Sequence, residues 1–222
     1  MTVGGKAVGK AVTRRLTVTD PNAVQRLVGT FKLDAGAAPS GRAPTGSYFE
    51  MLTGSGSPLP NLSSPAANKN YTPFTPGTDG GLRTDRYQPA PAPAFAQGNS
   101  GGALASAIIR PVPFFSVNFS VVTGSTDAQL GVHDALPVIT AQHGALTGKL
   151  SAWVAQWNGQ SFNQGTPKPD GTLPSPTTRL SGTYNATTHA FTLTWKSRIV
   201  GGPFNGFTGS WHLAGTFVPA RS

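Results

Sequence analysis

Two short stretches in the C-terminal half combine aromatic rings with side-chain amides, a pairing that can bind sugars. They read WNGQSFNQG at residues 157–165 and GGPFNGFTG at residues 201–209. Aromatic faces stack on sugar rings, while Asn and Gln exchange hydrogen bonds with sugar hydroxyls. The candidate ligand-binding residues are therefore Trp157, Phe162, Asn163, Phe204, Asn205 and Phe207. Because aromatic residues also dominate cores, we expect Trp195 and Trp211 to be core residues instead.

Acid–base and metal chemistry have few candidates in this chain. Glu50 is the one glutamate, whereas glycoside hydrolysis normally uses two carboxylates. Several aspartates stand in turn-like contexts, where the carboxylate commonly bonds its own backbone. A metal site at His133, Asp134 and His143 is conceivable, but isolated, hydrogen-bonded imidazoles explain these histidines more simply. The sequence therefore predicts no catalytic residue, no metal site and no cofactor.

The net charge of +9 arises from 17 Lys and Arg against 8 Asp and Glu. Such a balance can indicate an anionic partner: nucleic acid, a lipid surface or an acidic glycan. The bases are spread along the chain, so the balance reflects a shortage of acids, and a nucleic-acid partner is not favoured. A glycan or another anionic surface stays open as a partner. Only residues 1–19 look concentrated, and they predict a basic N-terminal arm or a leading strand.

Cysteine is absent, which removes disulfides, thiolate nucleophiles and Cys-based metal sites. No apolar run approaches the roughly 20 residues that span a bilayer, so we expect no transmembrane segment. The N-terminus also lacks the apolar region of a signal peptide. The low-charge composition, rich in Thr, Ser, Asn and Gly, favours an extracellular or cell-surface protein whose signal lies outside this numbering. A cytoplasmic location stays open.

The elements that must position these residues are predicted to be strands. Trp211, Leu213, Gly215 and Phe217 alternate with polar or small residues, which is typical of a strand with one buried face. The chain holds 28 Gly and 20 Pro, and only 11% of it is charged, a composition that suits turn-rich β structure better than helices. We therefore expect one all-β domain over residues 20–222, an antiparallel β-sandwich or β-barrel with long Pro/Gly-rich loops.

Alternation and turn residues predict individual elements within that domain. The expected strands are 30–33, 47–52, 115–123, 137–142, 145–157, 182–184, 190–195 and 211–218. Residues 103–109 are apolar but ambiguous in type. One short helix is expected at Asp20–Gly29, because Asp20 can cap it, Pro21 suits its first position and Gly29 can close it.

Residues 34–102 are rich in turn residues yet carry several aromatic side chains, which disordered linkers rarely do. We expect ordered loops packed over the β core, and loops of this length are usually functional or interaction surfaces.

Three functions follow as hypotheses. The first is a non-catalytic binding or structural protein at the cell surface that associates with itself, as a homo-oligomer, or with another protein. The second is a β-barrel that encloses a small apolar ligand, with isomerase- or cyclase-like catalysis as an extension. The third is a carbohydrate-binding module. Convergence of residues 157–165 and 201–209 on one concave surface would bear most directly on this choice.

Overall fold

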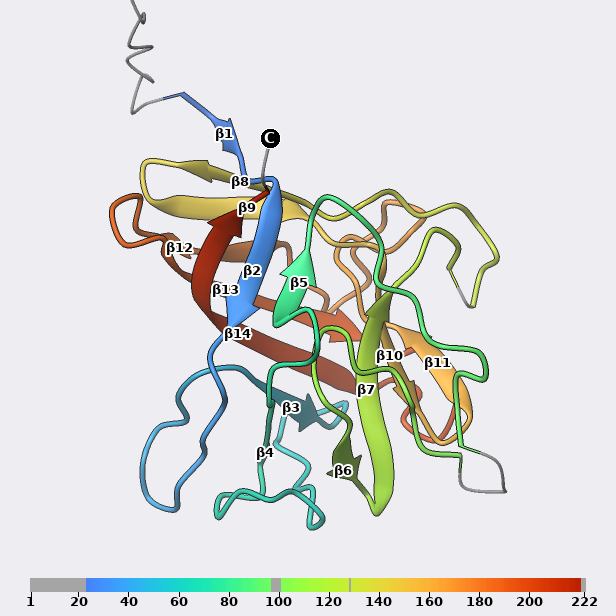
Figure 1. The fold of residues 1–222 in the computed structure, drawn as a ribbon. Coiled ribbons are helices and arrows are strands. Elements are labelled where there is room, and N and C mark those ends of the chain that lie inside the picture. The colour runs from blue at the N-terminus through green and yellow to red at the C-terminus, as the bar shows by residue number, and fades with distance from the viewer. Residues whose placement is uncertain (1–22, 97–100, 128, 221–222) are drawn as a thin grey trace, which may run out of the picture.

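The protein is an all-β structure in a computed structural model that describes residues 23–96, 101–127 and 129–220. Fourteen strands and no helix are found in these residues (Figure 1). The described chain accordingly has no helix of the length and apolarity that a membrane crossing requires. The predicted basic arm at residues 1–19 lies outside the described residues.

Ten strands form one large antiparallel sheet that curls into a half-barrel (Figure 1). Along the main path its strands are β1 (Gln25–Arg26), β8 (Val138–Gln142), β9 (Ala145–Lys149), β12 (Leu180–Tyr184), β13 (Ala190–Arg198), β14 (Thr208–Pro219), β2 (Gly29–Leu33) and β5 (Gly81–Arg83). Off this path, β3 (Tyr48–Leu52) pairs with β14, and β4 (Tyr71–Pro73) pairs with β3.

A second, four-stranded antiparallel sheet packs against the inner face of the large one. Its strand order is β11 (Gln160–Asn163), β10 (Trp153–Trp157), β7 (Val117–Thr123) and β6 (Val112–Phe114). Its other face is covered by the chain around Ala105, whose carbonyl accepts a 2.6 Å hydrogen bond from the Ser120 hydroxyl. Ala105 also packs on Val122 and Val154. The small sheet is therefore buried on both faces, which explains why every residue of β10 is buried.

Strand β14 is a central strand of the large sheet, because it is paired along both edges. One edge pairs with β13 from Thr208 to Thr216, while the other edge pairs first with β3 and then with β2. Trp211, Leu213 and Phe217 point into the core, so the predicted buried face is confirmed.

Tryptophans from both sheets form the centre of the core. The rings of Trp195 and Trp211 stack with centroids 5.7 Å apart, and Trp153 of the small sheet meets each of them edge-on at 5.4 and 5.3 Å. The Gln164 carbonyl and side-chain oxygens accept hydrogen bonds from the Trp195 and Trp211 indoles. The prediction that Trp195 and Trp211 are core residues is confirmed.

The helix predicted at Asp20–Gly29 is wrong over its described residues, 23–29. Gln25 and Arg26 instead form β1 against β8, and the Leu27 amide donates to the Ile139 carbonyl at 2.9 Å. The predicted helix would have been about two turns long, a length that is marginal on its own. Pairing with β8 satisfies these backbone groups and still buries Leu27.

The single strand predicted at 145–157 is also wrong, because the chain changes sheets within it. Strand β9 belongs to the large sheet and β10 to the small one, with a turn at residues 150–152 between them. The strand predicted at 115–123 begins at Val117, since Phe115 and Ser116 form a turn with φ of 46° and 65°. The other predicted strands overlap observed ones, and the ambiguous residues 103–109 form no regular strand.

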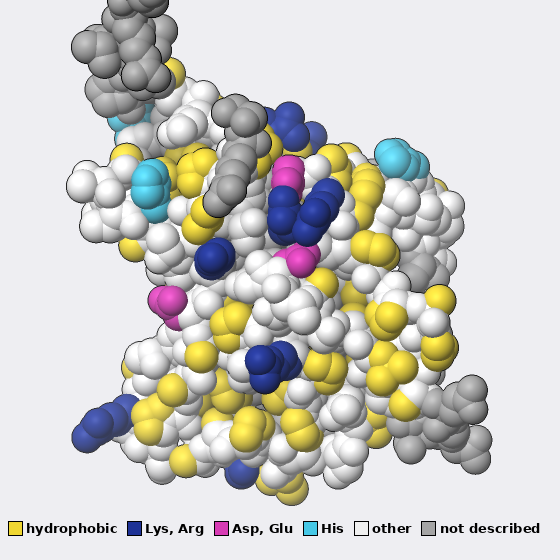
Figure 2. All heavy atoms as spheres, viewed as in Figure 1, with side chains coloured by type: hydrophobic (Ala, Val, Ile, Leu, Met, Phe, Trp, Pro, Cys, Tyr) yellow, Lys and Arg dark blue, Asp and Glu magenta, His cyan; other side chains and the backbone are white. Residues whose placement is uncertain are grey.

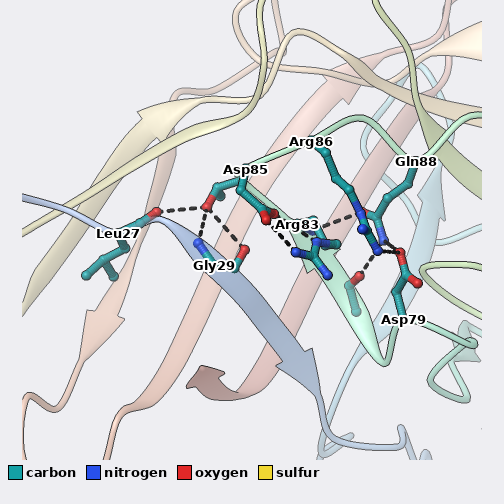
Figure 3. A network of polar contacts seen from close by, with 9 residues as sticks. Leu27, Gly29, Asp79, Arg83, Asp85, Arg86 and Gln88 are labelled. Carbon is teal, nitrogen blue, oxygen red and sulfur yellow. Dashed lines mark hydrogen bonds and ion pairs between the residues drawn. The ribbon is translucent and has the colours of Figure 1, made fainter. Parts of the chain in front are cut away.

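The expectation that loops within 34–102 are ordered is met where the structure describes them, and a polar network shows how (Figure 3). The buried Thr84 hydroxyl donates to the Leu27 carbonyl and accepts from the Gly29 amide, both at 2.9 Å. The Gln88 amide donates to the Asp79 carboxylate and the Gly81 carbonyl at 2.9 Å. The Thr84 bonds fasten this segment to the start of β2, and the Gln88 bonds hold residues 79–88 together. On the face drawn in Figure 2, some Lys and Arg side chains lie beside Asp or Glu in the upper part of the view, and the others stand singly.

Candidate functional site

The two aromatic stretches singled out from the sequence do meet in space. The rings of Trp157 and Phe204 lie 5.3 Å apart between centroids. Gly202 sits directly over β11, since a Cβ atom there would lie 2.7 Å from both Gln160 Oε1 and Phe162 Cε1. The loop at 201–207 therefore covers the end of the small sheet.

Three of these six candidate side chains are buried. Trp157 and Phe162 are only 9% and 7% exposed, and the Trp157 indole donates to the Phe114 carbonyl at 2.6 Å. The Asn163 amide is buried and donates to Asp127 Oδ2 at 2.8 Å and to the Ser151 carbonyl at 2.7 Å. These three side chains therefore have structural partners.

The remaining candidates lie in the covering loop. Phe204 and Phe207 are half-buried and pack on each other with centroids 6.0 Å apart. Asn205 is exposed, and its side-chain oxygen accepts a 2.9 Å bond from the Gly201 amide. Beneath them lies an apolar void of about 30 Å³, whose lining includes Phe49, Phe114, Trp157, Phe162 and Phe204. This volume is on the scale of one or two water molecules.

A larger and more polar groove lies on the outer face of the large sheet. It has a volume of about 360 Å³ and is formed by β3, β4, β13, β14 and the chain entering β12. Its lining residues are Tyr48, Glu50, Tyr71, Thr178, Arg179, Ser181, Thr194, Trp195, Lys196, Ser210, Trp211 and His212. We call it the outer groove. Sequence reasoning missed it, although both strands that carry Tyr48, Glu50 and His212 were predicted.

Strand register sets the geometry of the outer groove. In one row across the sheet, Tyr71 pairs with Glu50, Glu50 with Ser210, and Ser210 with Lys196. Directly opposite residues of antiparallel strands have Cβ atoms about 5 Å apart. In the next row, Tyr48 pairs with His212, and His212 with Thr194. The two rows bring aromatic, carboxylate, hydroxyl and ammonium groups together in one groove.

Three half-buried rings form one end of the groove. Tyr48 stacks on His212 with centroids 4.8 Å apart and an 18° angle between planes. Tyr71 meets Tyr48 nearly edge-on, at 5.2 Å and 78°. The rings hold one another in place, so this end of the groove is preorganised for a ligand with an apolar face.

Burial controls the ionisation of this end of the groove. It raises the pKa of Tyr48 and of Tyr71, with neighbouring Glu50 adding to both shifts. Burial also lowers the pKa of His212, so its imidazole is neutral at pH 7. Burial raises the pKa of Glu50, while nearby Lys196 opposes that shift.

This arrangement suits binding better than catalysis. The phenols stay protonated, so neither tyrosine is a phenolate nucleophile. Among the groove residues Glu50 is the one carboxylic acid, and hydrolysis of a glycoside normally needs a pair. What the groove offers is ring faces, hydroxyl and carboxylate acceptors, and N–H and O–H donors.

Among the cations of the described residues, Lys168 has the most strongly shifted pKa, but all three N–H donors of its ammonium already have acceptors. It is 7% exposed, and Nζ donates to the Asn163 carbonyl, the Ser197 hydroxyl and the Arg198 carbonyl at 2.7, 2.8 and 2.9 Å. Burial lowers the pKa of Lys168 to about 8, although Asp127 and Asp170 oppose the shift. An ammonium with all three donors engaged ties the loop after β11 to β13.

Within the described residues, no three His, Asp or Glu side chains are grouped in a way that could hold a metal ion. The conceivable site at His133, Asp134 and His143 is thus not assembled. Comparison of the chain with protein-family models, with curated proteins and with solved structures finds no match.

Proposed function

We propose that this protein is a non-catalytic carbohydrate-binding protein and that the outer groove holds the sugar. The observation that carries the proposal is the meeting of Tyr48, Tyr71 and His212 with Glu50 and Ser210 in one groove. Sugar rings present apolar C–H faces to aromatic side chains, and their hydroxyls bond to carboxylates and hydroxyls.

The proposal replaces the residues of the sequence-based carbohydrate hypothesis but keeps its chemistry. Trp157 is buried against the rings of Phe114 and Phe204, and Phe162 is buried in the core, whereas the outer groove is open along the sheet. The apolar void of about 30 Å³ lends no support to the enclosed apolar-ligand alternative, because a ligand larger than water does not fit.

A glycan array followed by titration calorimetry tests the proposal. Tyr71→Ala should abolish binding of any glycan the protein retains, because it removes one of the groove's rings, whereas Phe204→Ala should leave binding unchanged. Loss of binding in Phe204→Ala with retention in Tyr71→Ala would move the site to the loop at 201–207. Absence of binding to every glycan on the array would remove the function altogether.

An extracellular or cell-surface location and self-association accompany this function as proposals. A surface carbohydrate-binding protein gains avidity when several grooves engage one polymer, which favours an oligomer. Light scattering that gives a strict monomer at micromolar concentration would remove the oligomer.

A further inference from the structure

The outer face of the large sheet carries a row of hydroxyl groups that continues beyond the outer groove. Starting at His212, direct cross-strand partners lead through Thr194, Ser181 and Thr147 to Thr140. The row crosses β14, β13, β12, β9 and β8, which at about 4.8 Å per strand spans roughly 19 Å.

These hydroxyls are ordered by one another while remaining accessible. Thr140 and Thr147 have Oγ1 atoms 3.1 Å apart, and Ser181 and Thr194 hydroxyl oxygens lie 3.4 Å apart. Thr147, Ser181 and Thr194 are exposed, and Thr140 is half-buried. Each hydroxyl can both donate and accept, so the row offers a repeated contact to a polymer that lies across the strands.

A row of cations runs beside the hydroxyls. Lys196 and Arg179 lie at the wall of the outer groove, where the Thr178 amide donates to the Lys196 carbonyl at 3.0 Å. Lys149 follows Gly148, whose cross-strand partner is Leu180, the residue after Arg179. Lys149, Arg179 and Lys196 are all exposed and stand on neighbouring segments of the sheet.

This placement costs stability, because like charges opposite one another on neighbouring strands repel. Asp85 and Asp79 pair with Arg83 and Arg86 elsewhere on the molecule, whereas no ion pair is found for these three cations within the described residues. An anionic ligand would relieve the repulsion.

We propose that the ligand is a linear acidic polysaccharide that crosses the strands, with its carboxylates on the cation row and its hydroxyls on the Thr/Ser row. This inference rests on the proposed function, because one end of the polymer occupies the outer groove. A polymer carrying both carboxylates and hydroxyls matches both rows. A nucleic acid fits less well, since it carries fewer free sugar hydroxyls along its chain and would leave most of the hydroxyl row without a partner.

Galacturonate oligomers of two to eight residues are the probe, with cello-oligosaccharides of the same lengths as the neutral series. We expect affinity for the acidic series to rise with length and to fall with added salt. Arg179→Gln and Lys149→Gln should each weaken binding of the octamer by about three- to tenfold. Lys32→Gln removes an exposed cation from β2 of the same sheet and should leave affinity unchanged.

The outcomes separate this inference from the function it rests on. Binding of the neutral series alone would overturn the acidic ligand while keeping the carbohydrate site. An equal loss of affinity in Lys32→Gln would show general charge attraction and overturn the cation row, and so would equal competition by oligo-dT. Binding of neither series would count against this inference, and the glycan array decides separately whether the function survives. The melting temperature of each variant should match that of the unmodified protein, because all three residues are exposed.

Discussion

The Ser47 hydroxyl is bonded to both backbone groups of Ala214, donating to its carbonyl at 3.0 Å and accepting from its amide at 3.1 Å. It does so where β14 passes from its partner β3 to its partner β2. One side chain thus replaces the missing strand at the junction. The same junction sets the direction of β3, and with it the positions of Tyr48 and Glu50 in the outer groove.

Ser47→Ala should therefore destabilise the fold by about 1–3 kcal/mol, because it leaves the half-buried Ala214 amide without its acceptor. Urea unfolding measures this difference, and exposed Ser57→Ala serves as the control. If Ser47→Ala unfolds at the same urea concentration as the unmodified protein, the hydroxyl does not hold the junction.

Gly209 of β14 lies tightly against the core beside Trp211. A Cβ atom there would lie 2.2 Å from Gln164 Oε1 and 2.9 Å from both Phe49 Cε2 and Trp211 Nε1. Gly209→Ala should cost about 1–3 kcal/mol through overpacking and should change tryptophan fluorescence, because Gln164 must leave the Trp211 indole. Ser210→Ala, next along the strand but on the outer face, should leave the spectrum unchanged; a spectral change in both variants would contradict this account.

The sheet was predictable from the sequence because one face of β14 is core and the other is not, so residues 211–218 alternate. The false helix at residues 20–29 arose because Asp20, Pro21 and Gly29 are local signals, whereas the pairing of β1 with β8 joins residues more than a hundred positions apart. Strand β10 is apolar on both sides because the chain around Ala105 covers it, which hid the change of sheet at residues 150–152.

Most of the strands that form the outer groove were predictable from the sequence, but their arrangement was not. The reason is that the strands that pair there are far apart along the chain. Alternation placed His212 opposite the buried face of its strand, and residues 47–52 were predicted to be a strand with no face assigned to Tyr48 or Glu50. That β3 lies beside the first half of β14 follows from no local pattern. The aromatic stretch at 157–165 was singled out because it combines aromatic rings with side-chain amides, but its rings are buried between the two sheets.

Asp134 is a buried carboxylate, and neither of its oxygens has a well-formed hydrogen bond within the part of the chain that the structure describes. Burial raises the pKa of Asp134, and the nearby Ser151 and His133 side chains oppose the shift only in part. The folded protein thus holds a proton that the unfolded chain releases near pH 4, so stability falls as the pH rises from there through the folded pKa. Asp134→Asn should raise stability at pH 7 by on the order of 1 kcal/mol and flatten this fall in thermal melts; a loss of stability at pH 7 would contradict the assignment.

Lys168 should make the stability of the fold rise with pH in the alkaline range, the opposite of the trend expected from Asp134. Its folded pKa of about 8 lies below the ordinary 10.5, so the unfolded chain holds a proton that the folded protein releases. Its contribution to stability therefore rises between about pH 8 and pH 10.5, and the difference between unmodified protein and Lys168→Met isolates this rise.

At pH 7 Lys168→Met should lower the free energy of unfolding by about 3 kcal/mol, because three acceptors lose their donor, while exposed Lys32→Met should lower it little. Parallel pH profiles for the protein and Lys168→Met would contradict the assignment.

If the outer groove binds sugars as proposed, Glu50 should distinguish neutral from acidic ligands. Burial raises the pKa of Glu50 above its ordinary 4.5, with Lys196 opposing the shift. As the pH falls through this raised value, the carboxylate gains a proton and loses acceptor capacity, so affinity for a neutral oligosaccharide should fall. Affinity for a galacturonate oligomer should fall less, because protonation also removes a repulsive charge. Calorimetry between pH 4 and pH 7 measures both trends.

The Glu50→Gln variant tests the same residue directly. Its affinity for the neutral ligand should lose the pH dependence that Glu50 causes. Its affinity for the galacturonate oligomer at pH 7 should be about two- to fivefold higher than that of the unmodified protein. Weaker binding of the galacturonate oligomer by Glu50→Gln would place the polymer's carboxylates away from Glu50 and its strand.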